Sequence, residues 1–192
     1  MQTNKKLLLL LLLPILFSCT NNREKKQNQT DIIDDYNQLV KQKIEQLEKE
    51  NNGLSIVNQN IYWGNDTLNL VSFDKFTNEK KLYFYFSQNT CSPCIEESIH
   101  LIEKFIPDYL ENENVVFLSP DYIPRFRNNC YGKRLLGLKN GSLEIPLEEE
   151  NIPFFFMLKE NLQIEDLHIV NKNDFEKTAE YLKKISSNRD LK

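Results

Sequence analysis

Short apolar runs alternate with stretches of helical spacing over most of the chain. The runs are rich in β-branched and aromatic residues, which favour strands. Strands are predicted at residues 54–57, 61–63, 67–71, 81–86, 114–119, 153–158 and 163–170. Helices are predicted at residues 95–110, 125–136 and 174–185, where apolar residues recur at steps of three and four. This order predicts an α/β fold with a central mixed β-sheet flanked by helices on both faces.

An amphipathic helix is predicted before these elements, at residues 31–53. Apolar residues recur at helical spacing from Ile33 to Leu47, and Gly53 ends the helix. The apolar stripe could pack on the chain's own domain or on a partner helix, and the first arrangement is the commoner one. We therefore expect an N-terminal helix at 31–53, followed by a main domain at 54–187 that begins with a β-hairpin extension.

The first thirty residues have the pattern of a secretion and anchoring signal. Two lysines precede the apolar run Leu7–Phe17, as in a signal peptide. The following Ser18-Cys19 resembles the lipobox of bacterial lipoproteins, which implies cleavage before Cys19 and its lipidation, for example with palmitate. An uncleaved anchor or an ordinary signal is the alternative, although the run is short for a membrane span. We expect a signal peptide at 1–18 and a lipidated flexible tether at 19–30.

Composition narrows the possible functions. The chain has 192 residues, a length that fits one domain with extensions. Its formal net charge of −4 and its pI near 5.4 give no reason to expect nucleic-acid binding. Four cysteines are too few for a disulfide scaffold. Outside the cytoplasm, however, the environment is oxidising, so a pair of these cysteines can hold a disulfide.

A Cys-Ser-Pro-Cys motif at residues 91–94 follows the aromatic strand and begins the next helix. The first thiol, Cys91, is placed at a helix N-terminus, where free N–H groups and the helix dipole favour a thiolate. Cys94 follows one turn later and can attack a mixed disulfide formed by Cys91. Pro93 has no N–H to donate and is tolerated at a helix start. The motif predicts a reversible dithiol with Cys91 as nucleophile and Cys94 as resolving thiol.

The order of the elements, the dithiol after the first core strand and a proline at the start of the third core strand together resemble the thioredoxin fold. The resemblance covers residues 68–185, and it implies that Pro153 forms a cis peptide bond and packs beside the dithiol. With its signal and its extra strands, the chain is most similar to membrane-anchored thioredoxins of the TlpA/ResA type. These proteins often carry a glutamate three residues after the second cysteine, and Glu97 stands there.

Three positions depart from the thioredoxin pattern. Thr90 stands where tryptophan usually precedes the first cysteine. Tyr85 stands where cytoplasmic thioredoxins carry a buried aspartate, and Phe154 stands where threonine is common. These differences bear on substrate preference and redox potential, and they leave the dithiol in place.

The resemblance also implies roles for residues around the dithiol. Glu97 would accept the proton of Cys94, and the alternative is a solvated glutamate in the first helical turn. Ile152 and Pro153, together with Pro93, would form the substrate-binding surface, where an extended segment pairs with the backbone as an added strand. The alternative for Pro153 is a proline that simply begins a core strand.

Several other residues are candidates for a role in the site. Cys130 is expected to be an inert buried thiol, and the alternative is a place in the redox relay. His100 and His168 are expected to be structural or exposed. The glutamates at 148–150 are expected to form a solvated loop face, or alternatively to change the charge near the dithiol. Trp63 is most simply explained by packing of the hairpin.

These features predict a lipid-anchored extracytoplasmic thiol–disulfide oxidoreductase that faces the periplasm and reduces disulfides of specific envelope proteins. Its partners would be those disulfide-bearing proteins and an upstream membrane electron donor, with no cofactor and no metal. The alternative is a non-catalytic thioredoxin-fold binding protein in which the cysteine pair is a structural disulfide. The spacing of the cysteines matches no zinc pattern, and no peroxidatic motif is visible.

Overall fold

The computed structural model describes residues 32–63, 66–77, 79–120 and 131–187. The elements after the N-terminal helix are β1(Asn60–Trp63), β2(Asp66–Ser72), η1(Phe73–Phe76), β3(Leu82–Tyr85), α2(Ser92–Phe105), β4(Val115–Ser119), β5(Leu135–Leu138), η2(Pro146–Glu150), β6(Phe154–Leu158), β7(Ile164–Ile169) and α3(Phe175–Ser187). The predicted signal peptide, Cys19, the tether and Cys130 lie outside the described residues.

Seven strands form one mixed sheet in the order β2-β1-β5-β4-β3-β6-β7. Strands β3, β4 and β5 run parallel, whereas β6 and β7 run antiparallel to their neighbours. Strands β1 and β2 form an antiparallel hairpin that joins the sheet through β5. Helix α2 follows β3, and α3 follows the β6–β7 hairpin. This is the arrangement of a thioredoxin-like fold, so the expected fold class is confirmed.

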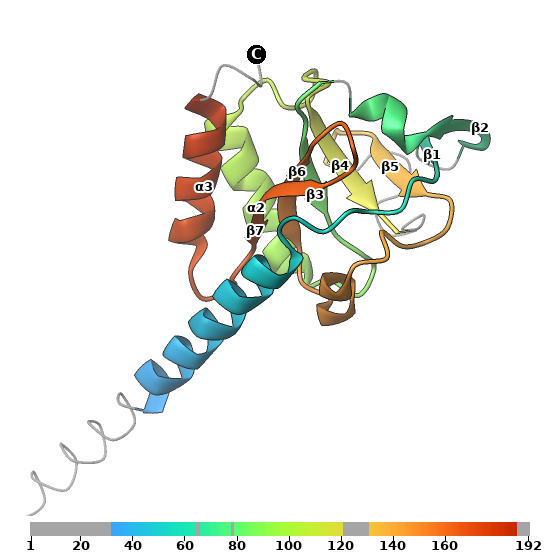
Figure 1. Ribbon diagram of the computed structural model, residues 1–192. Helices are drawn as coiled ribbons and strands as arrows, with labels where there is room; N and C mark the ends of the chain where they lie inside the picture. The colour runs from blue at the N-terminus through green and yellow to red at the C-terminus, as the bar shows by residue number, and fades with distance from the viewer. Residues whose placement is uncertain (1–31, 64–65, 78, 121–130, 188–192) are drawn as a thin grey trace, which may run out of the picture. The chain divides into compact units, whose positions relative to one another are not determined.

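The sheet has a core on each face. On one face, α2 and α3 lie side by side and pack against the side chains of Leu82, Phe84 and Phe86 (Figure 1). On the other face, Tyr83 and Tyr85 join a second apolar cluster that includes residues of the segment before η2. Alternate residues of β3 therefore point into different cores, as the period of a strand requires.

Aromatic pairs join the two central strands β3 and β6. The rings of Tyr83 and Phe156 stack with centroids 5.1 Å apart. Those of Phe84 and Phe155 stack at 4.5 Å, and each pair is aligned in the strand register. Stacked cross-strand rings stabilise a sheet beyond the area they bury. They account for the strong strand signal in both segments of the sequence.

The N-terminal helix spans residues 32–51. The chain divides into two compact units, and the second begins at Ile44, inside this helix. Within the second unit, Ile44 and Leu47 pack against the core on the face of the sheet that α2 and α3 leave uncovered. The backbone N–H of Ile169 donates to the Glu48 carboxylate (2.8 Å). No helix in the described ranges combines the length and apolarity that crossing a membrane would demand.

Three sequence-based element predictions are wrong in type or extent. A helix was expected to continue through residue 136, but Leu135–Leu138 is the strand β5, buried between β4 and β1. Long-range pairing overrides the local spacing here, because both faces of this short apolar run are covered. The strand expected at 54–57 is reduced to one bridge between Ser55 and Gln163. Helix α2 also ends earlier than expected, because Pro107 disfavours helical geometry in the residue before it.

Replacement of Gly137 by alanine should destabilise the fold by about 1–3 kcal/mol. Tyr62 lies directly opposite Gly137 in the β1–β5 pair, and an added Cβ would collide with its rigid ring. Urea unfolding of Gly137→Ala measures this loss. In a Tyr62→Ala background the same glycine substitution should cost less than about 1 kcal/mol, because the colliding ring is gone. An equal loss in both backgrounds would contradict the steric explanation.

Candidate redox site

The dithiol lies at the turn between β3 and α2. Ser87 and Thr90 close this turn, since the Thr90 N–H donates to the Ser87 carbonyl (3.1 Å) and the Ser87 N–H donates to Thr90 Oγ1 (2.9 Å). Thr90 is only 3% exposed, so it is a structural residue of the turn. Cys91 is the N-cap of α2, and its carbonyl accepts from the N–H groups of Cys94 and Ile95. Pro93 lies in the first turn, where the sequence predicts it to be tolerated.

The two thiols differ in exposure. Both are free cysteines, with Cys91 exposed and Cys94 buried at 4% exposure. Burial, followed by a hydrogen bond with Cys91 and the charge of Cys91, raises the pKa of Cys94 to about 12. Cys91 is therefore the thiol that a large partner can reach, and Cys94 is held protonated beneath it.

Glu97 is exposed on α2, so the burial on which its predicted proton role depends is absent. The next residue, Ser98, is fully buried and donates its hydroxyl to the Cys94 carbonyl (2.8 Å). A role for Glu97 in accepting the Cys94 proton stays a prediction.

Ile152 and Pro153 lie where the strand register brings them close to the dithiol turn. Phe154 pairs with Tyr85, which places Pro153 across from Phe86, the last residue before the turn. The Pro153 carbonyl accepts from Val170 N–H (3.0 Å). Within the described ranges, the backbone N–H and carbonyl of the half-buried Ile152 have no hydrogen-bond partner. A role for Ile152 and Pro153 in binding an extended substrate stays a prediction.

The resemblance implied a cis peptide bond before Pro153, and this prediction is wrong. No cis peptide bond occurs among the described residues, so the Ile152–Pro153 bond is trans. The trans form is the favoured one for a prolyl bond. Asn151 adopts a left-handed conformation (φ 54°) at the end of η2 and turns the chain toward β6 in its place.

Lys172 is a residue of the site that the sequence did not reveal. It lies in the loop between β7 and α3, two residues after Val170, whose N–H binds Pro153. Its positive charge acts on Cys94 and lowers the pKa of that thiol, against the larger effects of burial and Cys91. Only the paired register of β6 and β7 brings this loop to the start of α2, so no local pattern marks it.

The glutamates of η2 do not form a uniformly solvated face. Glu148 is partly buried and accepts hydrogen bonds from the Tyr85 hydroxyl (2.6 Å), the Ser142 hydroxyl (2.6 Å) and the Leu143 N–H (2.9 Å). Glu149 and Glu150 are exposed, as expected. Glu148 therefore stabilises the segment before η2 and satisfies the buried hydroxyl of Tyr85.

A second polar cluster connects a hydroxyl, a histidine and a carboxylate as a catalytic triad does, but it is structural. His168 Nε2 lies 3.0 Å from Thr178 Oγ1, and its Nδ1 lies 3.3 Å from Glu48 Oε1. Thr178 is completely buried, so no substrate can reach its hydroxyl. The ring of His168 also stacks on Tyr181, with centroids 4.8 Å apart. His100 is exposed on α2. In the part of the chain that the structure covers, no three histidine, cysteine or acidic side chains gather as metal ligands.

No family model and no curated protein matches this chain. An uncharacterized thioredoxin-like protein from Porphyromonas gingivalis is 17% identical with a TM-score of 0.46, over 71% of this chain and 92% of that one. A PrxQ variant from Xylella fastidiosa is 14% identical with a TM-score of 0.47, over 71% and 96%. The thioredoxin domain of a thiol-disulfide oxidoreductase from Bacteroides vulgatus is 15% identical with a TM-score of 0.39, over 67% and 98%. The chain's own strand order establishes its fold.

Alkylation should distinguish the two thiols of the reduced protein. At pH 8, a thiol with a pKa of about 12 is ionised roughly one time in ten thousand, so iodoacetamide should label Cys94 at least about a hundredfold more slowly than Cys91. Peptide mass spectrometry separates these two positions from the other cysteines. In guanidinium both should react at the same rate. Fast labelling of Cys94 in the folded protein would contradict its burial.

Proposed function

We propose that the chain is an extracytoplasmic thiol–disulfide oxidoreductase that reduces disulfides in other proteins. The observation that supports this most strongly is the exposed Cys91 at the N-cap of α2, hydrogen-bonded to the buried Cys94. A pair with one accessible and one protected thiol suits a two-step exchange. The unpaired backbone of Ile152 supplies a place beside it for an extended substrate.

The exchange transfers two electrons from the dithiol to the substrate. The Cys91 thiolate attacks one sulfur of the substrate disulfide, and the other substrate sulfur leaves as a thiolate and takes up a proton. Cys94 then loses its proton and attacks Cys91 Sγ, which releases the second substrate thiol. The products are a reduced substrate and a Cys91–Cys94 disulfide. A membrane electron donor that carries its own dithiol would then restore the reduced pair.

The causes of the raised Cys94 pKa support this order of events. Besides burial, the hydrogen bond and the charge of Cys91 contribute to it. Both contributions disappear when Cys91 Sγ is bonded to a substrate sulfur. Cys94 therefore becomes easier to ionise in the mixed disulfide than in the resting dithiol, when its attack is needed. Lys172 favours the same ionisation in both states.

The location and partners complete the proposal. The signal-like segment and Cys19 support a lipid anchor on a bacterial membrane, with the domain in the periplasm. Specific envelope proteins with disulfides are the proposed substrates.

Mass spectrometry of the protein from membranes of its own host tests the anchor, because a diacylglyceryl group should be found on Cys19. An unmodified Cys19 would exclude the proposed lipid anchor and would leave the redox proposal unaffected.

Single serine variants should separate the two chemical steps. Cys94→Ser lacks the resolving thiol and should accumulate a mixed disulfide with insulin, visible on a non-reducing gel. Cys91→Ser should form none, and both should lose insulin reduction with dithiothreitol as electron source. Wild-type rates in both variants would exclude the dithiol mechanism. If the wild-type Cys91–Cys94 disulfide resists reduction and exchange, the result would instead favour the alternative, in which the chain is a binding protein and this disulfide is structural.

Lys172→Gln should lengthen the lifetime of the mixed disulfide about two- to fivefold at low ionic strength. The substitution removes the positive charge that favours the Cys94 thiolate. Because Lys172 is exposed, salt screens its charge, and the difference in lifetime should shrink at about 0.5 M salt. Rapid acid quenching measures this lifetime. Lys183→Gln, at an exposed lysine on α3, is the matched control and should leave the lifetime unchanged.

Glu97→Gln in the same assay tests whether Glu97 accepts the Cys94 proton. If it does, the attack of Cys94 on the mixed disulfide should become slower and pH-dependent in this variant.

A further inference from the structure

A hollow of about 470 Å³ opens at the end of the sheet opposite the dithiol. Its lining comes from the N-terminal ends of the parallel strands, where Lys81 precedes β3, Val115 begins β4 and Arg134 precedes β5. The dithiol instead follows the C-terminal end of β3. This hollow, here called the Trp63 pocket, is therefore separate from the redox site.

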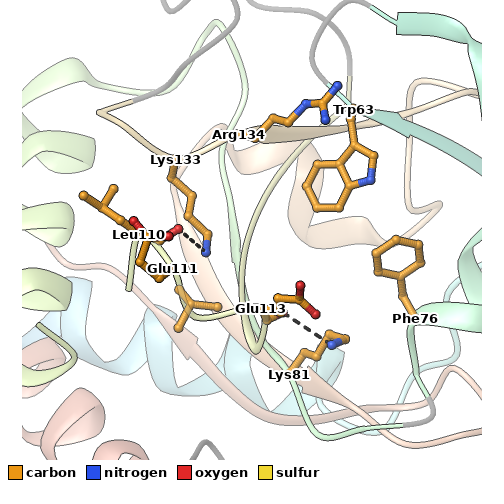
Figure 2. Close-up of a pocket in the computed structure, with 9 residues that line it drawn as sticks. Trp63, Phe76, Lys81, Leu110, Glu111, Glu113, Lys133 and Arg134 are labelled. Carbon is orange, nitrogen blue, oxygen red and sulfur yellow. Dashed lines mark hydrogen bonds between the residues drawn. The ribbon is translucent and has the colours of Figure 1, made fainter. Parts of the chain in front are cut away.

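Apolar groups form two of its walls. Figure 2 shows the rings of Trp63 and Phe76 on one side, facing Lys133 and Leu110 on the other. The two ring centroids lie 5.8 Å apart at a tilt of 58°. The volume lies within the range of small-molecule sites, and aromatic walls suit a flat apolar ligand. The pocket is large enough for a body of about one or two rings.

Two buried lysines line the pocket; Lys81 is paired with the Glu79 carboxylate (3.4 Å), so the positive field comes from Lys133. Lys81 and Lys133 are each 8% exposed. The Lys133 ammonium donates to the carbonyl oxygens of Tyr109 (2.6 Å) and Asn112 (2.7 Å), and no described carboxylate pairs with it. Burial lowers the pKa of Lys133, since carbonyl oxygens replace water only in part. A nearby anion would offset this cost.

Arg134 supplies hydrogen-bond donors at the rim. Its guanidinium carbon lies 5.8 Å from the centroid of the Trp63 ring, which holds the planar group in position. Arg134 is exposed, and among the described residues its guanidinium has no hydrogen-bond or ion-pair partner, although its charge also acts on the Asp66 carboxylate. An arginine stacked on an aromatic ring presents its N–H edge for two parallel bonds to a carboxylate.

Two carboxylates oppose this field, but they are weaker in effect. Glu111 and Glu113 also line the pocket, and both are exposed. Water screens an exposed charge with a dielectric near 80, whereas about 20 applies to partly buried charges, so the buried Lys133 ammonium acts roughly four times more strongly than either glutamate at equal distance. The buried Lys133 ammonium, together with the N–H donors of Arg134, therefore favours a negative ligand.

We propose that the Trp63 pocket binds a small organic anion with a flat apolar body, of the class of aromatic carboxylates. The body stacks against Trp63 and Phe76, and the carboxylate binds the N–H edge of Arg134 within the field of Lys133. Binding is noncovalent and does not require the dithiol.

The indole of Trp63 provides a direct measurement, because it is the only tryptophan in the chain. Its single N–H signal in a proton–nitrogen NMR spectrum is followed during titration with 2-naphthoate. Neutral 2-naphthalenemethanol and cationic 2-naphthylmethylammonium serve as probes with the same ring system. We expect saturable shifts with naphthoate and an affinity at least about tenfold above that for either other probe. Equal binding of the three probes, or no shift with any, would overturn the proposal.

Variants then assign the carboxylate contact. Arg134→Gln should weaken naphthoate binding about tenfold and leave the affinity for the neutral probe unchanged. Arg134→Lys should give an intermediate loss, because the positive charge remains but the paired N–H donors of the guanidinium are gone. Lys139→Gln removes an exposed charge at the other end of β5 and is the matched control. Unchanged naphthoate affinity in Arg134→Gln would refute the contact. Insulin reduction by Arg134→Gln should equal wild type, so this outcome is independent of the redox proposal.

Discussion

The stacked aromatic pairs between β3 and β6 are the interaction on which the redox site depends. Tyr85 and Phe154, the last pair of this ladder, stack with centroids 4.6 Å apart. A slip of one residue would turn every ring to the wrong face of the sheet, so the register has a strong energetic preference. Because Phe154 faces Tyr85, Pro153 must face Phe86, where the dithiol turn begins. The packing of the core thus determines which backbone lies beside the reactive sulfur.

The same strand end accounts for the difference between the two thiols. After β3 the chain turns through Ser87–Thr90 and enters α2 at Cys91, which remains at the surface as the N-cap. Cys94, three residues later, faces inward because the following residues, from Ile95 to Ile102, pack that side of the helix on the sheet. An amphipathic helix docked at its first turn thereby gives one reactive and one protected sulfur. Burial and the neighbouring thiol then hold the second proton until the first sulfur is bonded elsewhere.

Sequence patterns predicted the parts of this molecule that depend on local order. The aromatic strand, the dithiol at the helix start and the final hairpin all follow from periodicity and turn chemistry. The strand β5 did not, because Leu135–Leu138 is a strand only through its pairing with β1 and β4. Lys172 was missed for a similar reason, since its neighbours come from distant segments. The exposure of Glu97 was also invisible, because helical spacing gives a face but not the partner that covers it.

The two ends of β3 have different chemical surroundings, and this follows from the direction of the parallel strands. At the C-terminal end, Cys91 is the N-cap of α2, so the dithiol lies at the positive end of the helix dipole. At the N-terminal end, the chain returning from α2 presents carbonyl oxygens, and Lys81 and Lys133 bind them. These ammonium groups satisfy carbonyl acceptors there, and the buried Lys133 charge favours the negative ligand proposed for the Trp63 pocket. The strand β3, buried at every position, separates the two sites.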